Sequence, residues 1–260
     1  EDNPIDLTAG WNMIGYLRLE PADAAAVLFD INATNNLVIV KDYAGQAYLP
    51  EWDFNGIGDM KPGEGYQLKL NNDDVLTYIS NDDSYRVSSI TVTNNAPTHF
   101  EKVTLTDNNM TVVIEDASWD ILPENGAEIG AYDASGNLVG SVKYTSPVTV
   151  LTLWGDDVTT ISKDGLETIE VSSFKVWSNN QTTSFEITEW SEGSSAYTAD
   201  AINIASSIST SNIVTQELST IRELVRVINV LGQEVNVQDA FKGEVLFNVY
   251  NDGTVEMTVN

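Results

Sequence analysis

The densest group of residues that could do chemistry is a set of three aspartates beside a glycine. Asp156, Asp157 and Asp164 lie close together in the sequence, and Gly165 follows the last of them. A hard cation such as Ca²⁺ is held by several carboxylate and carbonyl oxygens of a loop, so these side chains are candidate calcium ligands. Their spacing does not follow the EF-hand loop. The alternative is turn chemistry, in which carboxylates accept hydrogen bonds from backbone N–H groups.

Aromatic residues form a second group. Trp11, Tyr48, Trp52 and Tyr66 occur near the start of the chain among Asp and Asn residues. Aromatic faces with polar neighbours can bind a sugar or a partner protein, and the alternative is that several of them fill a core. Four further tryptophans are expected mainly to fill a core, with a sugar-stacking surface as the functional alternative: Trp119, Trp154, Trp177 and Trp190.

Catalytic groups are scarce in this chain. It has no cysteine, and its one histidine, His99, precedes Phe100 in what reads as a loop entering a strand. A Ser-His-Asp triad or a multi-histidine zinc site would need that single residue. Paired carboxylates for glycoside hydrolysis arise by chance in an acidic chain, and small modules leave little scaffold for a cleft. We therefore predict that the protein is not an enzyme.

The charge balance excludes other classes of partner. The chain has 12 Lys and Arg against 39 Asp and Glu, a net charge of −27. Such a surface repels phosphate backbones and anionic lipid heads, so we expect no nucleic-acid partner. No apolar run is long enough to span a membrane. The first residues lack a basic region followed by an apolar one, so we expect any signal peptide to lie upstream or to have been removed.

The elements that hold the aromatic group belong to residues 1–84, which read as an α+β module. Strands are expected around 10–16 and 37–40, and residues 63–70 are expected to form a glycine-containing turn that runs into an alternating strand. The alanine-rich run 21–29 is the best helix candidate, with Pro21 near its first turn.

Residues 85–211 read as a β-sandwich domain, because short apolar strands recur between turn residues. A hairpin loop is expected at 133–137, with Gly136 free to adopt positive φ. The domain ends in a Ser, Thr and Asn-rich stretch, 205–212, that has the composition of a linker. The fold class is therefore mainly β, with a small C-terminal β-sandwich domain after the linker.

Residues 212–260 alternate as two hairpins and resemble the sorting domains of cargo of the type IX secretion system in Bacteroidota. The order of the three short motifs, and their place at the C-terminus, carry the resemblance. The motif residues are Leu231, Gly232, Glu234, Lys242, Gly243, Tyr250, Asp252, Gly253 and Glu256. The preceding segments are similar to modules found upstream of such domains in surface proteins of Bacteroidota.

The resemblance implies a secreted or outer-surface protein of adhesion type, whose partners are the type IX translocon and its shuttle proteins. A recognition domain of this kind needs an accessible strand edge or loop and no reactive side chains. Two alternatives remain open. The chain is a self-assembling fibre, layer or virion-like subunit, or it is an accessory carbohydrate-binding fragment of a larger secreted enzyme that contacts a surface glycan.

Overall fold

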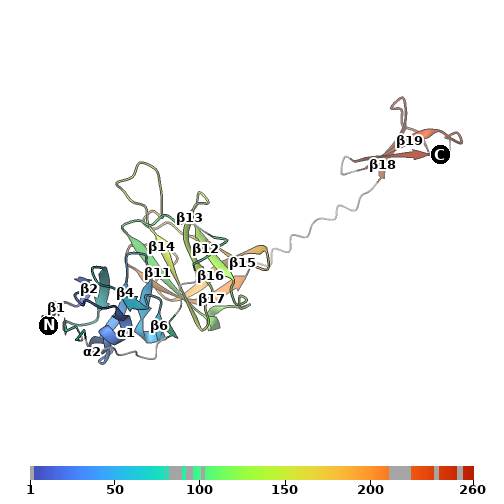
Figure 1. Ribbon diagram of the computed structural model, residues 1–260. Coiled ribbons are helices and arrows are strands. Elements are labelled where there is room, and N and C mark those ends of the chain that lie inside the picture. The colour runs from blue at the N-terminus through green and yellow to red at the C-terminus, as the bar shows by residue number, and fades with distance from the viewer. Residues whose placement is uncertain are drawn as a thin grey trace. The chain divides into compact units, whose positions relative to one another are not determined.

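The computed structural model describes residues 3–78, 80–81, 90–91, 96–100, 103–210, 224–236, 240–250 and 254–260. The chain is mainly β, as the sequence predicts, and it forms two compact units, Glu1–Ser211 and Asn212–Asn260 (Figure 1). The second unit begins at the residue where the C-terminal domain was expected. The boundary expected between residues 84 and 85 lies inside the first unit.

The first part of the large unit is built on a six-stranded sheet with the order β10-β6-β5-β4-β8-β2. Its strands are β2 (Gly10–Gly15), β4 (Leu37–Lys41), β5 (Ala47–Leu49), β6 (Phe54–Asn55), β8 (Gly65–Leu70) and β10 (Ile90–Thr91). Two short pairs complete this part: β1 (Ile5–Leu7) with β9 (Asp74–Leu76), and β3 (Ala22–Asp23) with β7 (Asp59–Met60). The strands expected at 10–16 and 37–40, and the one within 63–70, are confirmed.

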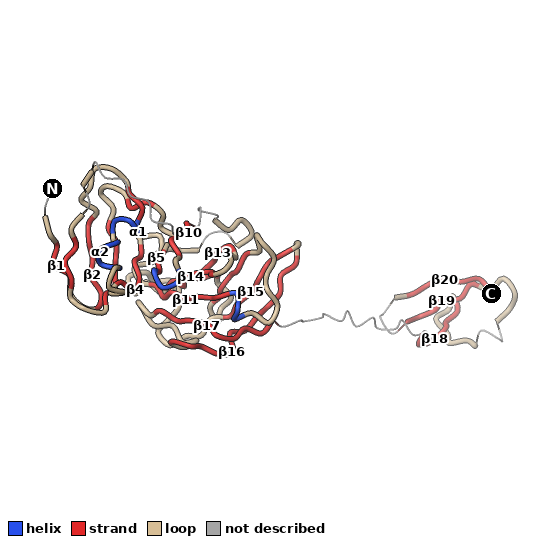
Figure 2. Tube along the Cα trace, turned by 90° about the horizontal axis from the view of Figure 1, so that it is seen from below, coloured by secondary structure: helices blue, strands red, loops and turns tan. Residues whose placement is uncertain are grey.

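The helical segment is also confirmed, but it consists of two short helices, α1 (Ala24–Val27) and α2 (Phe29–Asn32). It begins later than expected, because Asp23 caps α1: its Oδ1 accepts hydrogen bonds from the N–H groups of Ala25 (3.0 Å) and Ala26 (3.2 Å). The described residues also include two single turns of 3₁₀ helix, Pro50–Trp52 and Asp116–Ser118. Figure 2 shows how short these helices are beside the strands.

The second part of the large unit is a seven-stranded sheet with the order β13-β12-β15-β16-β17-β11-β14. Its strands are β11 (Asn109–Glu115), β12 (Glu128–Tyr132), β13 (Leu138–Lys143), β14 (Val148–Trp154), β15 (Ser173–Ser178), β16 (Gln181–Glu192) and β17 (Ile202–Thr210). Neighbouring strands are antiparallel except for β11 and β17. The expected hairpin loop joins β12 to β13, and Gly136 has a φ of 86°.

This sheet curves so that one face encloses a core. Buried apolar side chains from all seven strands belong to a single cluster, among them Val112, Ile129, Val139 and Leu151. The two edge strands, β13 and β14, pass so closely that a Cβ on Gly140 would meet Leu153 Cδ2 at 2.7 Å. The architecture is therefore sandwich-like, with an unpaired seam between β13 and β14.

The two parts of the large unit share a third core cluster, made by the outer face of the seven-stranded sheet and by β4, β5 and β6. Val113 and Val150 pack there with Ile39 and Leu49. Beside this cluster the buried Lys41 donates a hydrogen bond to Asn109 Oδ1 over 2.8 Å. Because apolar packing and a buried polar contact both join the two parts, they form one compact unit.

One expectation for this unit was wrong. The Ser and Thr-rich stretch expected as a linker forms most of β17 up to Thr210, between β16 and β11. Ala205 and Ile208 are buried in the core, while Ser206 and Ser209 are exposed. Ala205 and Ile208 both join the core although they are three residues apart, and register shifts in the β16–β17 pair accompany this departure from simple alternation. Composition alone was therefore misleading.

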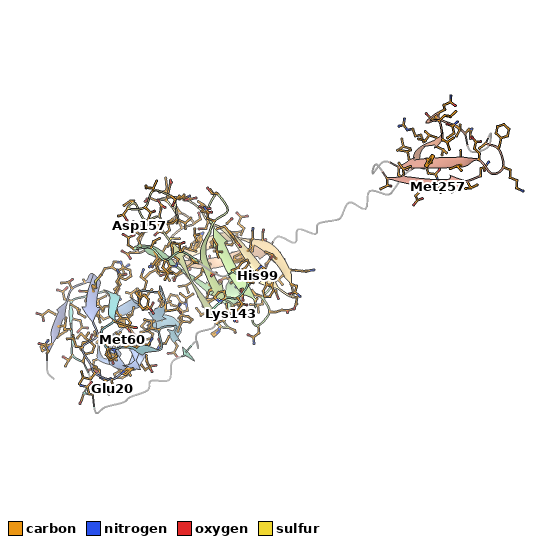
Figure 3. All side chains as sticks on the ribbon, turned by 45° about the horizontal axis from the view of Figure 1, so that its top comes forward. Glu20, Met60, His99, Lys143, Asp157 and Met257 are labelled. Atoms are coloured by element: carbon orange, nitrogen blue, oxygen red, sulfur yellow. The ribbon has the colours of Figure 1, made fainter. Side chains whose placement is uncertain are left out.

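The described residues of the small unit form one antiparallel sheet with the order β18-β19-β20. Its strands are β18 (Leu224–Asn229), β19 (Val245–Tyr250) and β20 (Val255–Val259). Val227 and Leu246 are buried on one face. Cross-strand pairing places a row of apolar residues on the other face: Ile228, Val245, Phe247, Val249, Val255, Met257 and Val259. Figure 3 labels Met257 on this unit, where its side chain is largely exposed.

Candidate functional site

The three-aspartate group lies in a loop whose two arms are joined at a narrow neck. Leu166 N–H donates to Trp154 O, and Asp156 N–H donates to Leu166 O, each over 2.9 Å. A Cβ on Gly165 would fall against the backbone carbonyl of Gly155 and 2.7 Å from Asp156 N, so the arms can approach only with glycine at this position. The two arms, residues 154–157 and 163–166, are therefore hydrogen-bonded to each other and form the neck of one loop.

Each of the three carboxylates accepts hydrogen bonds within this loop. Asp156 Oδ1 accepts from Asp164 N–H over 2.8 Å, and Asp164 Oδ1 accepts from Asp157 N–H over 3.0 Å. Asp157 Oδ1 accepts from both the N–H and the hydroxyl of Thr159. Across the described ranges, no group of three or more His, Asp and Glu side chains is arranged to hold a metal ion. The structure thus gives these residues the turn chemistry that was the alternative to calcium binding.

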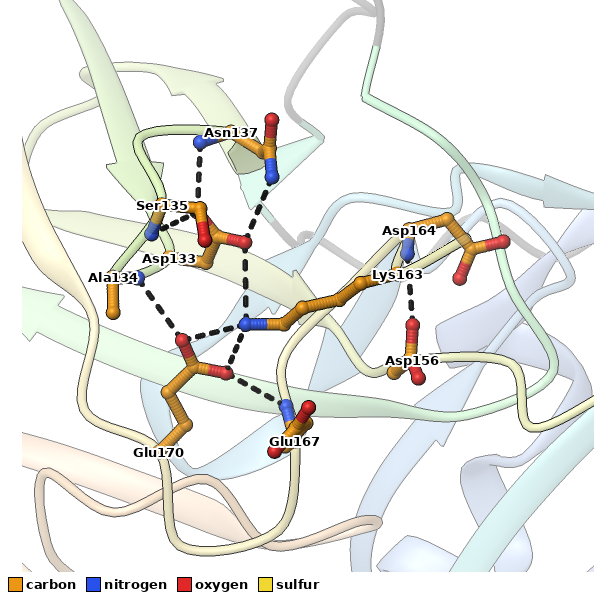
Figure 4. Close-up of polar contacts among 9 residues, drawn as sticks. All are labelled: Asp133, Ala134, Ser135, Asn137, Asp156, Lys163, Asp164, Glu167 and Glu170. Carbon is orange, nitrogen blue, oxygen red and sulfur yellow. Dashed lines mark hydrogen bonds and ion pairs between the residues drawn. The ribbon is translucent and has the colours of Figure 1, made fainter. Parts of the chain in front are cut away.

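The loop is tied to the neighbouring β12–β13 hairpin by Lys163 (Figure 4). Its Nζ lies 2.7 Å from Glu170 Oε2 and 3.3 Å from Asp133 Oδ2. Burial alone would lower the pKa of Lys163, but the hydrogen bonds to Glu170 and Asp133 raise it above its ordinary value. Glu170 also accepts hydrogen bonds from the N–H groups of Ala134 and Glu167. Lys163 therefore joins the base of the loop to the hairpin through ion pairs with Glu170 and Asp133.

The segment between the two arms of the neck presents apolar side chains to solvent. Val158 is 90% exposed and Ile161 is fully exposed. A loop with a fixed base and an apolar tip suits contact with another macromolecule, because burying those side chains is favourable and the base needs little reordering. The tip of this loop is therefore an exposed apolar surface.

No protein-family model, curated protein or solved structure matches this chain. The candidate sites are therefore judged on the geometry of their own residues. No helix within the described ranges is long and apolar enough to cross a membrane.

The aromatic surface expected in the first part is not present as such. Tyr48 and Tyr66 are buried in its core, and burial raises the pKa of Tyr48 to about 12. Tyr66 has a second structural role, since its hydroxyl donates to Glu64 Oε2 over 2.7 Å and accepts from Lys61 N–H. Trp11 and Trp52 are partly buried against the shared core. The prediction was wrong for the two tyrosines because Tyr48 lies in β5, which is buried throughout, and Tyr66 is at an inward position of the alternating strand β8.

The sandwich tryptophans divide into two kinds. Trp119 and Trp154 are buried, and Trp190 packs against the core. Trp177 is half-buried, and its ring stacks on His99 with centroids 4.5 Å apart and planes 8° from parallel. His99 lies in the turn at 98–100, which is held by Glu128: the buried carboxylate accepts hydrogen bonds from the N–H groups of Thr98, His99 and Phe100. The exposed His99 ring and the half-buried Trp177 ring thus form a stacked pair at the surface.

The C-terminal motif residues lie in the turns and strands of the small unit. Leu231 is 78% exposed and precedes Gly232, which has a φ of 76°; Gly243 has a φ of 90° in the next turn, after Lys242. Glu234 bridges to Ile228. Tyr250 donates a hydrogen bond to Glu256 across the β19–β20 pair. Asp252 and Gly253 lie outside the described residues.

Two features were missed by sequence reasoning. One is the buried Glu128, which opens β12 and serves the turn at 98–100. The other is a cavity that contains Lys143. The residues of each feature are far apart in the chain, so no local motif marks them; the only signal for Glu128 was a charged residue at the start of an apolar strand.

Proposed function

We propose that this protein is a secreted or cell-surface binding or structural protein of adhesion type, exported by the type IX secretion route through recognition of its C-terminal unit. The observation that carries the proposal is that residues 212–260 form their own compact unit, with the described motif turns at 231–232 and 242–243 exposed. Leu231 is largely exposed at one turn, and glycines with positive φ shape that turn and the next.

The geometry of this unit is suited to being recognised by another protein. Strands β18 and β20 are the outer strands of the sheet. Residues 233–235 already hydrogen-bond to β18, so β20 offers the strand edge that can pair with an extended segment of a partner. The motif residues at the turns do not form the buried face, where Val227 and Leu246 lie. A translocon or shuttle protein could therefore contact the motif while the fold of the unit stays intact.

The export role predicts that residues 212–260 direct a fluorescent reporter out of the cell. The reporter, preceded by an inner-membrane signal peptide, is expressed in a Bacteroidota host with and without a working type IX translocon. We expect it in the medium or on the cell surface only when the translocon works. The double variant Leu231→Ser, Lys242→Ala should stay in the periplasm, because both side chains belong to the motif turns.

The matched control for export is Val225→Thr, which changes an exposed position of β18 outside the motif. It should be exported like the unchanged fusion. Retention of the unchanged reporter in the periplasm of both strains would show that the unit is not a type IX signal.

A second candidate function, self-assembly, is favoured by the apolar face of the three-stranded sheet. The three strands place no Asp or Glu on that face, where Arg226 pairs with Val249, and Glu234 approaches it only at its edge, where it bridges to Ile228. In a chain with a net charge of −27, repulsion between copies is therefore weak there. Unpartnered apolar faces of this kind often mark interaction surfaces. Two such faces could pack together in the manner of a sandwich.

Self-assembly predicts that the mass of the full chain in sedimentation velocity rises with concentration. Met257→Lys should abolish the rise, because it places a charge on the apolar face. Thr258→Lys is the matched control, since its side chain is exposed on the other face of the same strand. If the unchanged chain sediments as a monomer at all accessible concentrations, the face does not mediate assembly.

A further inference from the structure

A cavity of about 330 Å³ opens beside the contact between the two parts of the large unit. It lies along the unpaired seam of the seven-stranded sheet, next to the hairpin that joins β4 to β5. Phe54, Val150 and Trp154 give it apolar walls, and Ser141 and Lys143 of the edge strand β13 give it a polar side. Small-ligand sites have this composition, with apolar walls and a few polar groups, and this volume is near the lower end of their usual range.

The hairpin wall is held by tight contacts. Thr152 Oγ1 donates a hydrogen bond to Gly45 O over 2.7 Å. Gly45 has a φ of 78°, and a Cβ there would meet Thr152 Cγ2 at 2.7 Å and Trp154 Cζ2 at 2.9 Å. Because the backbone of the β4–β5 hairpin at Gly45 contacts β14 directly, this side of the cavity is preformed. A preformed wall lowers the entropic cost of ordering the site when a ligand binds.

Lys143 is the one basic residue in the described part of the large unit that has no acidic, carbonyl or aromatic partner. Its cross-strand neighbour is Glu128, whose carboxylate is occupied by the backbone of 98–100. The other basic residues that the structure describes in this unit each have a partner within the protein: Arg18, Lys41, Lys61, Lys69, Lys163 and Lys175. An unpaired ammonium group is notable in a chain where acids outnumber bases so strongly.

We propose that this cavity binds a small organic anion, with a flat apolar body against Phe54 and Trp154 and a carboxylate or sulfonate group on Lys143. The Ser141 hydroxyl shares a strand face with Lys143, two residues away, and is a second donor for the same anionic group. Charge-assisted hydrogen bonds of this type are stronger than neutral ones, so the lysine gives the site its selectivity for anions. The proposal concerns the large unit and does not depend on the export role of the C-terminal unit.

The test uses 2-naphthoate as the anionic probe and 2-naphthamide as its neutral match, titrated into the full chain by calorimetry. We expect saturable binding of 2-naphthoate. Lys143→Met should weaken it by about tenfold, the effect of losing one charge-assisted hydrogen bond, while binding of 2-naphthamide changes by less than about twofold. Ser141→Phe fills the cavity and should abolish binding of both probes.

The matched control is Lys61→Met, which removes an exposed lysine outside the cavity and should leave both affinities unchanged. Unfolding midpoints confirm that each variant is folded, and Ser141→Phe and Lys143→Met provide independent tests. Absence of saturable binding by 2-naphthoate would overturn the proposal. The proposal would also be overturned if Lys143→Met bound 2-naphthoate as tightly as the unchanged chain does. It would be overturned as well if Lys61→Met lost as much affinity for 2-naphthoate as Lys143→Met.

Discussion

Replacing Gly165 with alanine is expected to destabilise the large unit by about 3 kcal/mol, at the upper end of the usual cost of overpacking. The added Cβ would fall against the carbonyl of Gly155 and 2.7 Å from Asp156 N. Backbone atoms cannot rotate away as a side chain can, so the two arms of the neck must separate. The hydrogen bonds of Asp157 N–H to Asp164 and of Asp164 N–H to Asp156 should then be lost.

This loss of stability can be measured by urea unfolding followed by tryptophan fluorescence. All six tryptophans lie in the large unit, so the fluorescence reports on that unit alone. Amide exchange at Asp157 and Asp164 should accelerate more than exchange in β11. Gly15→Ala is the matched control, because no atom lies within 4 Å of a Cβ there, and it should be close to neutral. Equal stability of the two variants would mean that the neck can widen without cost.

Much of the fold could be predicted from local patterns, because alternation and turn residues determine strands and hairpins over short distances. Residues 133–137 are an example: Asp133 Oδ1 accepts from the N–H groups of Ser135 and Asn137, and Gly136 has the positive φ that the loop requires. The helix was also predicted from its alanines, although its start depends on the Asp23 cap. Such features need only a few neighbouring residues.

The misses arise where distant residues decide the outcome. Residues 205–210 have linker composition, but β16 and β11 supply hydrogen-bonding partners on both sides, so the stretch becomes a central strand. Tyr48 and Tyr66 resemble surface aromatics until the sheet that contains them is known. The cavity at Lys143 needs the packing of the β4–β5 hairpin on the seam of another sheet. None of these long-range contacts has a local sequence signature.

The second large effect is expected from Glu128→Gln, which should cost about 3 kcal/mol through lost hydrogen bonds to a buried charge. Glu128 is 1% exposed, and its Oε2 accepts from the N–H groups of His99 (2.7 Å) and Phe100 (3.0 Å), while Oε1 accepts from Thr98. Glutamine has one acceptor oxygen, so its NH₂ group would face backbone donors on one side. The turn at 98–100 should loosen, and the His99 ring should lose its fixed stacking on Trp177.

The charge of Glu128 also predicts how the stability difference between the unchanged chain and Glu128→Gln depends on pH. Burial alone would raise the pKa of Glu128, but the hydrogen bonds from Thr98, Phe100 and His99 lower it below its ordinary value. A carboxyl group with a lowered pKa in the folded state stabilises the fold fully above its unfolded pKa of about 4.3. This contribution is lost as pH falls through the lower folded pKa. The stability difference between the unchanged chain and Glu128→Gln should therefore be constant near neutral pH and shrink below about pH 4.

Asp120→Asn provides the matched control for this prediction. Asp120 also accepts hydrogen bonds, from the N–H and hydroxyl of Thr210, but it is exposed, so water can replace them. Its loss of stability should be much smaller than that of Glu128→Gln. If both substitutions have the same effect, or if the Glu128→Gln difference persists unchanged in acid, burial of the charged group is not what stabilises this turn. A large effect confined to Glu128 would instead mean that one buried carboxylate, opening β12, orders the segment that lies beside the Lys143 cavity.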